Sequence, residues 1–162
     1  MMTLHYAKAE SPVGTIYIVA DEKNLRAVTF HKLWSDYEKF QPTIEERQCA
    51  VTKKTALQLH EYFAGKRKTF DLPYELIGTE FQKKVWNALA KIPFGETRTY
   101  GQQAKQIGNP AAVRAVGGTN GRNPLWVILP CHRVIGTSGK LTGYAGGLEM
   151  KKFLLELEGH KF

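Results

Sequence analysis

The chain has 162 residues, of which 43% are hydrophobic, and it carries a formal net charge of +8. This length suits one domain or two small ones, and no apolar run approaches the roughly 20 residues of a membrane-spanning helix. The first residues lack the apolar segment of a signal peptide, and the only two cysteines lie far apart in the sequence. We therefore expect a cytoplasmic protein in a reducing compartment, with no membrane partner.

The positive charge is concentrated in the second half of the chain. Residues 78–162 hold 12 Lys and Arg against 5 Asp and Glu, whereas residues 1–77 hold 11 against 10. No Asp or Glu occurs between Glu96 and Glu149. A solvated basic surface would explain this pattern, but a long stretch without acidic residues fits a bound polyanion better. The charge distribution therefore favours a nucleic acid as the partner.

The first half predicts a small α/β domain at residues 1–77. Three strands with two close turns between them indicate an antiparallel meander, at residues 3–9, 14–20 and 25–30. Apolar residues then recur at helical spacing over residues 52–63, and Gly65 is a plausible helix stop. The segment around Pro73 is typical of a linker to a second domain.

Helix signals are clearer in the second half, which we predict to be a mostly helical domain at residues 78–162. Thr79 with Gln82 and Thr99 with Gln102 each match a capping box, in which the side chains satisfy free amides at a helix N-terminus. A final helix ends near Gly159, and its apolar face is expected to be formed by Met150, Phe153, Leu154 and Leu157.

Two of these helices are separated by a tight turn. Gly108 suits the exit from the helix that starts at Thr99, because it adopts the left-handed conformation without strain. Asn109 is a good N-cap and Pro110 a good first residue for the next helix, at 111–119. Two helices joined by a short Gly-containing turn indicate a helix-turn-helix motif.

The second helix of this motif consists almost wholly of small apolar residues. Arg114 is its only long side chain, whereas a recognition helix in the major groove normally carries several polar side chains that contact base edges. Two interpretations stay open from the residues alone. The helix is either buried in the core, or it lies against the narrow minor groove with Arg114 as its single long arm.

Cys131 stands beside His132 and Arg133 within an apolar run. It could be a buried structural cysteine that behaves as a small hydrophobic residue. A metal ligand would need further ligands at regular spacing, which Cys49 does not provide, so we expect no metal. A nucleophile would need a basic or cationic neighbour that favours the thiolate. His132 or Arg133 would serve if its side chain approached the sulfur.

Several separated motifs extend this pattern. Asn123-Pro124 precedes an apolar run into Pro130-Cys131-His132-Arg133-Val134, and Gly143-Tyr144-Ala145-Gly146-Gly147-Leu148 follows. In this order the motifs resemble the active site of the O6-alkylguanine-DNA alkyltransferase family. The resemblance runs from about Thr79 to Gly159, roughly the second half of the chain.

The resemblance implies a fold, a partner and a reaction. The first domain is expected to be similar to ribonuclease H, and the second to contain a winged-helix-like helix-turn-helix. The expected partner is double-stranded DNA that contains O6-alkylguanine. The damaged base would be flipped out through the minor groove, and its alkyl group would pass irreversibly to Cys131, once per protein molecule. O4-alkylthymine is a further possible substrate, no cofactor is expected, and the protein would be a monomer, with cooperative binding to DNA left open.

The resemblance also implies roles for individual residues. Cys131 is the acceptor, His132 is a base that acts through a water, and Glu158 orients that histidine. Tyr100 would face the base and donate a proton to it, and Asn123 would be a hinge residue. The other expected base contacts are Arg114, which fills the vacated stack, and Val134, Tyr144, Ala145 and Gly146. The expected DNA contacts are Ala112, Arg114, Ala115, Gly117, Gly118 and Arg122.

The alternative function is non-catalytic. A helix-turn-helix regulator with an inert, buried Cys131 would show the same helix pattern. A module that binds damaged DNA and recruits other repair enzymes would also share the basic second half. Only an enzyme would gain an alkyl group when it meets methylated DNA.

Overall fold

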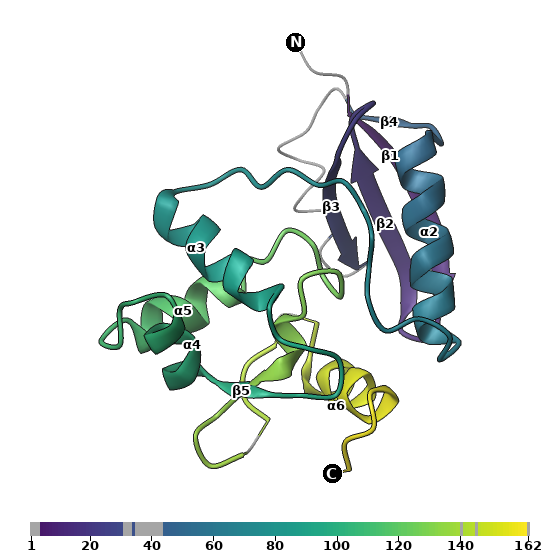
Figure 1. Cartoon of the computed structure of the whole chain (residues 1–162). Helices are drawn as coiled ribbons and strands as arrows, with labels where there is room; N and C mark the ends of the chain where they lie inside the picture. Colours follow the sequence, from purple (N-terminus) through teal and green to yellow (C-terminus); the bar gives the residue numbers. More distant parts are fainter. Residues whose placement is uncertain (1–3, 31–33, 35–43, 140, 145, 162) are drawn as a thin grey trace. The chain divides into compact units, whose positions relative to one another are not determined.

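The structure is a computed structural model, and it describes residues 4–30, 34, 44–139, 141–144 and 146–161. The chain divides into two compact units, Met1–Leu76 and Ile77–Phe162 (Figure 1). Among the described residues, no helix is both long and apolar enough to cross a membrane. The elements of the first unit are β1 (His5–Ser11), β2 (Gly14–Ala20), β3 (Leu25–Phe30), β4 (Glu45–Glu46) and α2 (Ala50–Phe63). Those of the second unit are α3 (Glu80–Leu89), β5 (Arg98–Thr99), α4 (Tyr100–Gln106), α5 (Val113–Asn120), the 3-10 helix η1 (Cys131–Arg133), β6 (Val134–Ile135) and α6 (Leu148–Leu157).

The first unit is built on a four-stranded sheet with the order β3-β2-β1-β4. The antiparallel pairs β1–β2 and β2–β3 form the meander that the sequence predicts, and the short β4 joins β1 in parallel. Helix α2 packs against one face of this sheet (Figure 1), and Leu59 and Tyr62 on it are buried. An aromatic cluster around the stacked rings of Tyr17 and Trp34 is also buried in this unit.

Both predicted capping boxes are confirmed in the second unit. The hydroxyl of Thr79 accepts a hydrogen bond from the amide of Gln82, and the side chain of Gln82 accepts one from the amide of Thr79. Thr99 and Gln102 repeat the arrangement at the start of α4. Each box fixes where a helix begins, and the second one makes Tyr100 the first residue of α4.

The helix-turn-helix pair α4–α5 is held by buried polar contacts. The side-chain amides of Gln103 and Asn120 exchange two hydrogen bonds, at 3.0 and 2.7 Å. The indole of Trp86 on α3 donates to the carbonyl oxygen of Thr119 on α5 at 3.0 Å. Because a buried polar group is costly unless it is paired, these bonds favour one packing of the three helices.

The predicted start of the second helix of this pair is wrong. Helix α5 begins at Val113 instead of residue 111, and Asn109 is not its N-cap. The carbonyl oxygen of Asn109 accepts a hydrogen bond from the amide of Ala112 at 3.0 Å, which closes a β-turn with Pro110 in its second position. Asn and Pro favour these turn positions as strongly as they favour a helix start, and here the turn forms.

The predicted apolar face of the last helix is also partly wrong. The buried face of α6 continues into its C-cap and is formed by Lys151, Leu154, Leu155 and Glu158. Phe153 is 38% exposed. Two stripes of α6 have helical spacing, and the buried one includes two charged residues, which a reading by hydrophobicity alone does not select.

Two short strands connect distant parts of the second unit. Strands β5 and β6 pair in parallel, with Arg98 opposite Val134 and Thr99 opposite Ile135. Tyr100 follows β5 directly, and Cys131 lies in the 3-10 helix that precedes β6. This pairing therefore brings two predicted site residues, 31 positions apart in the sequence, to the same region.

We predict that Thr79→Ala destabilises the second unit by about 1 kcal/mol, because the substitution removes the N-cap acceptor of α3. Thr79→Ser keeps the hydroxyl and is the control, with an expected change of a few tenths of a kcal/mol at most. Urea denaturation followed by circular dichroism measures both variants. Equal stability of Thr79→Ala and the parent protein would show that this capping box contributes nothing.

Candidate active site

The loop that leads to Cys131 is held by one buried amide. The side chain of Asn123 accepts a hydrogen bond from the amide of Leu125 at 2.9 Å and donates one to the carbonyl oxygen of Leu129 at 2.7 Å. Between them, Val127 has a φ of 72°, which is strained for a β-branched residue. Asn123 therefore fixes both ends of this strained loop, a position compatible with the predicted hinge.

The thiol of Cys131 is buried at the start of η1. Burial raises the pKa of Cys131 to about 12, although a hydrogen bond from Asn123 and the charge of Lys151 act in the opposite direction. A thiol with this pKa is protonated at neutral pH. Any reaction through the sulfur therefore needs a base that removes the proton.

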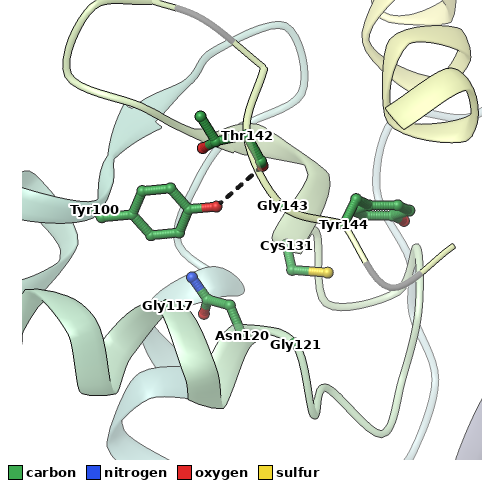
Figure 2. A pocket seen from close by; sticks show the side chains of 8 residues that line it. All are labelled: Tyr100, Gly117, Asn120, Gly121, Cys131, Thr142, Gly143 and Tyr144. Carbon is green, nitrogen blue, oxygen red and sulfur yellow. Dashed lines mark hydrogen bonds between the residues drawn. The ribbon is translucent and has the colours of Figure 1, made fainter. Parts of the chain in front are cut away.

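Cys131 lines a pocket of about 400 Å³. The other lining residues are Tyr100, Gly117, Asn120, Gly121, Thr142, Gly143 and Tyr144. Figure 2 shows Cys131 near the centre of this hollow, with Tyr100 and Asn120 on one side and Tyr144 on the other. The pocket thus combines the thiol with two aromatic rings, a lining suited to a flat heterocycle.

Both aromatic rings of the pocket are held in place. The hydroxyl of Tyr100 donates to the carbonyl oxygen of Thr142 at 3.4 Å (Figure 2). Burial raises the pKa of Tyr100, so its hydroxyl keeps its proton at neutral pH. The ring of Tyr144 meets that of Trp126 edge to face, with centroids 4.9 Å apart.

His132, the residue after Cys131, forms a buried pair with Glu158. Nε2 of His132 lies 2.6 Å from Oε2 of Glu158, and both side chains have no exposed surface. Nδ1 of His132 is buried and has no hydrogen-bond partner among the described residues. Burial lowers the pKa of His132 and outweighs the opposing effect of Glu158. The imidazole is therefore neutral at neutral pH.

Glu158 is also bound by Arg133, a contact that sequence reasoning missed. The guanidinium donates from Nε to Oε1 at 2.7 Å and from Nη2 to Oε2 at 3.1 Å. Burial alone would raise the pKa of Glu158, but the hydrogen bonds from His132 and Arg133 and the positive charge of Arg133 hold it well below its ordinary value. The guanidinium of Arg133 therefore forms an ion pair with Glu158, and no hydrogen bond to the sulfur of Cys131 is found among its contacts with the described residues.

Lys151 is a second functional candidate that the sequence did not indicate. It is fully buried, and its ammonium donates to the carbonyl oxygens of Val134 at 2.7 Å and Thr142 at 2.8 Å. Burial lowers the pKa of Lys151 to about 8. Lys151 thereby connects Thr142, which lines the pocket, to strand β6 through hydrogen bonds. Its position on the stripe Lys151, Leu154, Leu155 and Glu158 was the only signal in the sequence.

The remaining predicted base contacts are not all found at the pocket. Val134 is fully buried and lies outside the lining, and Gly146 is half-buried and also outside it. Arg114 is exposed on α5. Ala145 lies outside the described residues. Gly117, a predicted DNA contact, also lines the pocket, together with Asn120 and Thr142, which were not predicted.

Helix α5 presents most of its predicted DNA contacts to solvent. Arg114, Ala115 and Gly118 are exposed, as is Arg122 just after the helix, while Ala112 and Gly117 are half-buried. Only Val116, Thr119 and Asn120 are buried on α5. Of the two interpretations of this helix, the buried core helix is therefore wrong.

No group of three or more His, Cys, Asp or Glu side chains suited to a metal ion occurs in the part of the chain that the structure describes. Cys131 and Cys49 are both free. The groups described above are a buried thiol and a phenol that line the pocket, and a neutral imidazole paired with a carboxylate.

Two family models together span almost the whole chain. The model for the 6-O-methylguanine DNA methyltransferase DNA binding domain matches residues 80–160, and that for the ribonuclease-like domain of the same protein matches residues 4–76. The chain belongs to the 6-O-methylguanine DNA methyltransferase family. Membership confirms the predicted fold class, a sheet domain followed by a helical domain.

Individual members of this family are similar over nearly the full length. Methylated-DNA–protein-cysteine methyltransferase of Methanosarcina acetivorans is 53% identical and covers 96% of this chain and 99% of its own. The constitutive Bacillus subtilis enzyme of that name is 46% identical, with 95% and 94% covered. The Mycobacterium tuberculosis O6-methylguanine methyltransferase superposes with a TM-score of 0.87 at 46% identity, covering 96% of this chain and 93% of its own. Mycobacterium tuberculosis OGT in complex with DNA gives 0.86 at 45%, with 95% and 92% covered. As a family member, the chain is a DNA-repair methyltransferase that acts by direct reversal of damage.

We predict that the ionisation of Glu158 makes the stability of the fold depend on pH in the acidic range. Its pKa is lower in the folded protein than the value of about 4.3 in an unfolded chain, so its ionised form stabilises the fold above about pH 5. This contribution is lost as the pH falls from there through the folded pKa. Glu158→Gln should be less stable than the parent at pH 7, and the difference should shrink between pH 5 and pH 3. Urea midpoints across this range measure it, and a constant difference would contradict the assignment.

Proposed function

We propose that Cys131 is the alkyl acceptor of the reaction. It lines the pocket, whereas Cys49 is half-buried in the first unit at the start of α2. The sulfur would attack the alkyl carbon on O6 of guanine, forming a carbon–sulfur bond as the carbon–oxygen bond breaks. The thiol proton leaves to a base, and the leaving purine takes up one proton. A thioether is a poor leaving group, so each molecule would react once.

His132 is the proposed base, and its geometry supports the role. Its Nε2 faces the ionised Glu158, which can only accept hydrogen bonds, so the proton of the neutral ring lies on Nε2. Nδ1 is then free to accept the thiol proton, directly or through a water. Because burial keeps Cys131 protonated, such a base is needed. Glu158 would orient the ring and stabilise the imidazolium that forms.

The proposed substrate is O6-alkylguanine in double-stranded DNA, with O4-alkylthymine as a further candidate. A buried thiol cannot reach a base inside the stack, so the base must be flipped into the pocket. The purine would then lie between Tyr100 and Tyr144, and the phenol of Tyr100, protonated at neutral pH, could supply the proton that the purine takes up. All these groups come from one chain, so one molecule would suffice for the reaction.

Helix α5 is the proposed minor-groove surface. Its exposed side chains are small apart from Arg114, so the backbone can approach the narrow groove closely. Val113 beside Arg114 is 40% exposed, which adds an apolar contact for the sugar edges. A surface with almost no side chain that contacts base edges suits a protein that must act at guanine in any sequence. Arg122 would contact the phosphate backbone.

The first test is the site of alkylation. Incubation with a duplex that contains O6-methylguanine should add one methyl group to Cys131, because only this thiol lines the pocket. Intact-protein and peptide mass spectrometry measure the product, and transfer should stop at about one methyl per molecule. Cys131→Ala should bind the duplex without gaining mass, and Cys49→Ala should react as the parent does. A methyl group on Cys49, or continued transfer, would overturn the proposal.

The second test separates base flipping from chemistry. Arg114→Ala should slow transfer from duplex DNA by roughly ten- to a thousandfold, because part of the few kcal/mol that offsets flipping is lost. Transfer from free O6-benzylguanine should change little, since no base stack is opened. Arg114→Lys should recover only part of the rate because an ammonium lacks the planar group that stacks. Single-turnover rates measure both substrates, and equal losses on both would exclude insertion of Arg114.

A further inference from the structure

The proposed reaction assigns no role to Arg133, although several buried contacts hold its side chain. Its guanidinium is buried and makes the two bonds to Glu158 given above. A third donor, Nη1, binds the carbonyl oxygen of Ile92, and the ring of Phe94 lies 5.8 Å from the guanidinium carbon. Contacts with Glu158, Ile92 and Phe94 therefore hold the guanidinium in one orientation.

Two basic side chains, His132 and Arg133, therefore bind the carboxylate of Glu158. His132 approaches Oε2, while Arg133 contacts both oxygens, and the amide of Gly95 donates to Oε1 at 3.3 Å. Without the guanidinium, the full negative charge of a buried carboxylate at 2.6 Å would favour the protonated imidazole, with less to oppose it. An imidazolium has no free lone pair on Nδ1 and cannot act as a base.

The charges around His132 favour the neutral ring. The charges that act on it are one anion, Glu158, and two cations, Arg133 and Lys151. Burial is the largest influence that lowers the pKa of His132, and the charges of Arg133 and Lys151 act in the same direction. The negative charge of Glu158 is therefore already balanced before any proton reaches His132.

We propose that Arg133 is a positioning residue of the transfer reaction. By holding Glu158 in a two-point ion pair, it supplies the counter-charge that leaves His132 neutral, with its proton on Nε2 and Nδ1 free. This inference rests on the proposed role of His132 as the base. When the thiol proton reaches Nδ1, the imidazolium forms beside a carboxylate whose orientation Arg133 already determines.

The test combines nuclear magnetic resonance with a pH profile. The ¹⁵N shifts of His132 report its protonation state, and single-turnover rates with free O6-benzylguanine avoid the step of base flipping. In the parent protein we expect neutral His132 with the proton on Nε2 at pH 7. In Arg133→Met we expect an imidazolium at pH 7 and a rate that recovers with rising pH. Each unit by which the pKa of His132 exceeds the pH costs roughly tenfold in rate.

Two further variants distinguish charge balance from simple support of the fold. Arg133→Lys keeps the positive charge, so its pH profile should stay near that of the parent. Arg133→Met combined with Glu158→Gln removes both charges, so His132 should be neutral again. The midpoint of the pH profile of the transfer rate should then return to lower pH. Arg67→Met is the matched control, because it breaks an Arg–Glu pair at 3.0 Å in the first unit and should leave the profile unchanged.

The outcomes separate this inference from the proposed function. A loss of rate in Arg133→Met that is equal at every pH, with His132 still neutral, would reduce Arg133 to a structural role and overturn the inference. If Arg133→Met does not fold, the parent spectrum decides, since an imidazolium at pH 7 in the parent contradicts the inference. Failure of the parent protein to alkylate Cys131 would refute the proposed function instead.

Discussion

The buried carboxylate of Glu158 is the interaction on which the second unit depends. It lies at the C-cap of α6, where a negative charge is opposed by the helix dipole and by burial. Donors from His132, Arg133 and the amide of Gly95 offset both costs. These donors come from η1 and from the segment after α3, so one carboxylate joins α6 to two other parts of the chain.

Burial also governs the reactivity of the Cys131 thiol. A cysteine with a pKa near 12 is a weak nucleophile towards electrophiles in solution, which would suit a protein that reacts only once, as proposed here. In the proposed reaction, reactivity would then depend on His132, whose proton is fixed by Glu158, and on a substrate that fills the pocket. Lys151 adds a buried positive charge and holds the pocket segment at Thr142, so electrostatics and shape are coupled through one side chain.

The arrangement of α4, α5 and the cysteine loop would link the proposed DNA binding to the chemistry. Asn120 on α5 exchanges amide hydrogen bonds with Gln103 on α4 and also lines the pocket, and Asn123 just beyond α5 fixes the cysteine loop. A base delivered by the exposed face of α5 would therefore enter a pocket whose wall is the same helix. Small residues on that helix would allow the proposed close approach to DNA, and Gly117 leaves space beside the ring of Tyr100.

The sequence by itself determined the features that depend on neighbours within a few residues. Both capping boxes and the meander of β1 to β3 follow from contacts at short separation, and the motif around Cys131 pointed to the acceptor through family resemblance. Only the tertiary structure decided which stripe of α6 is buried, and that Arg133 pairs with Glu158, 25 positions away. It also decided that Asn109-Pro110 forms a turn instead of starting α5. Such choices are set by long-range packing and by the balance of buried charges, which no local pattern of residues contains.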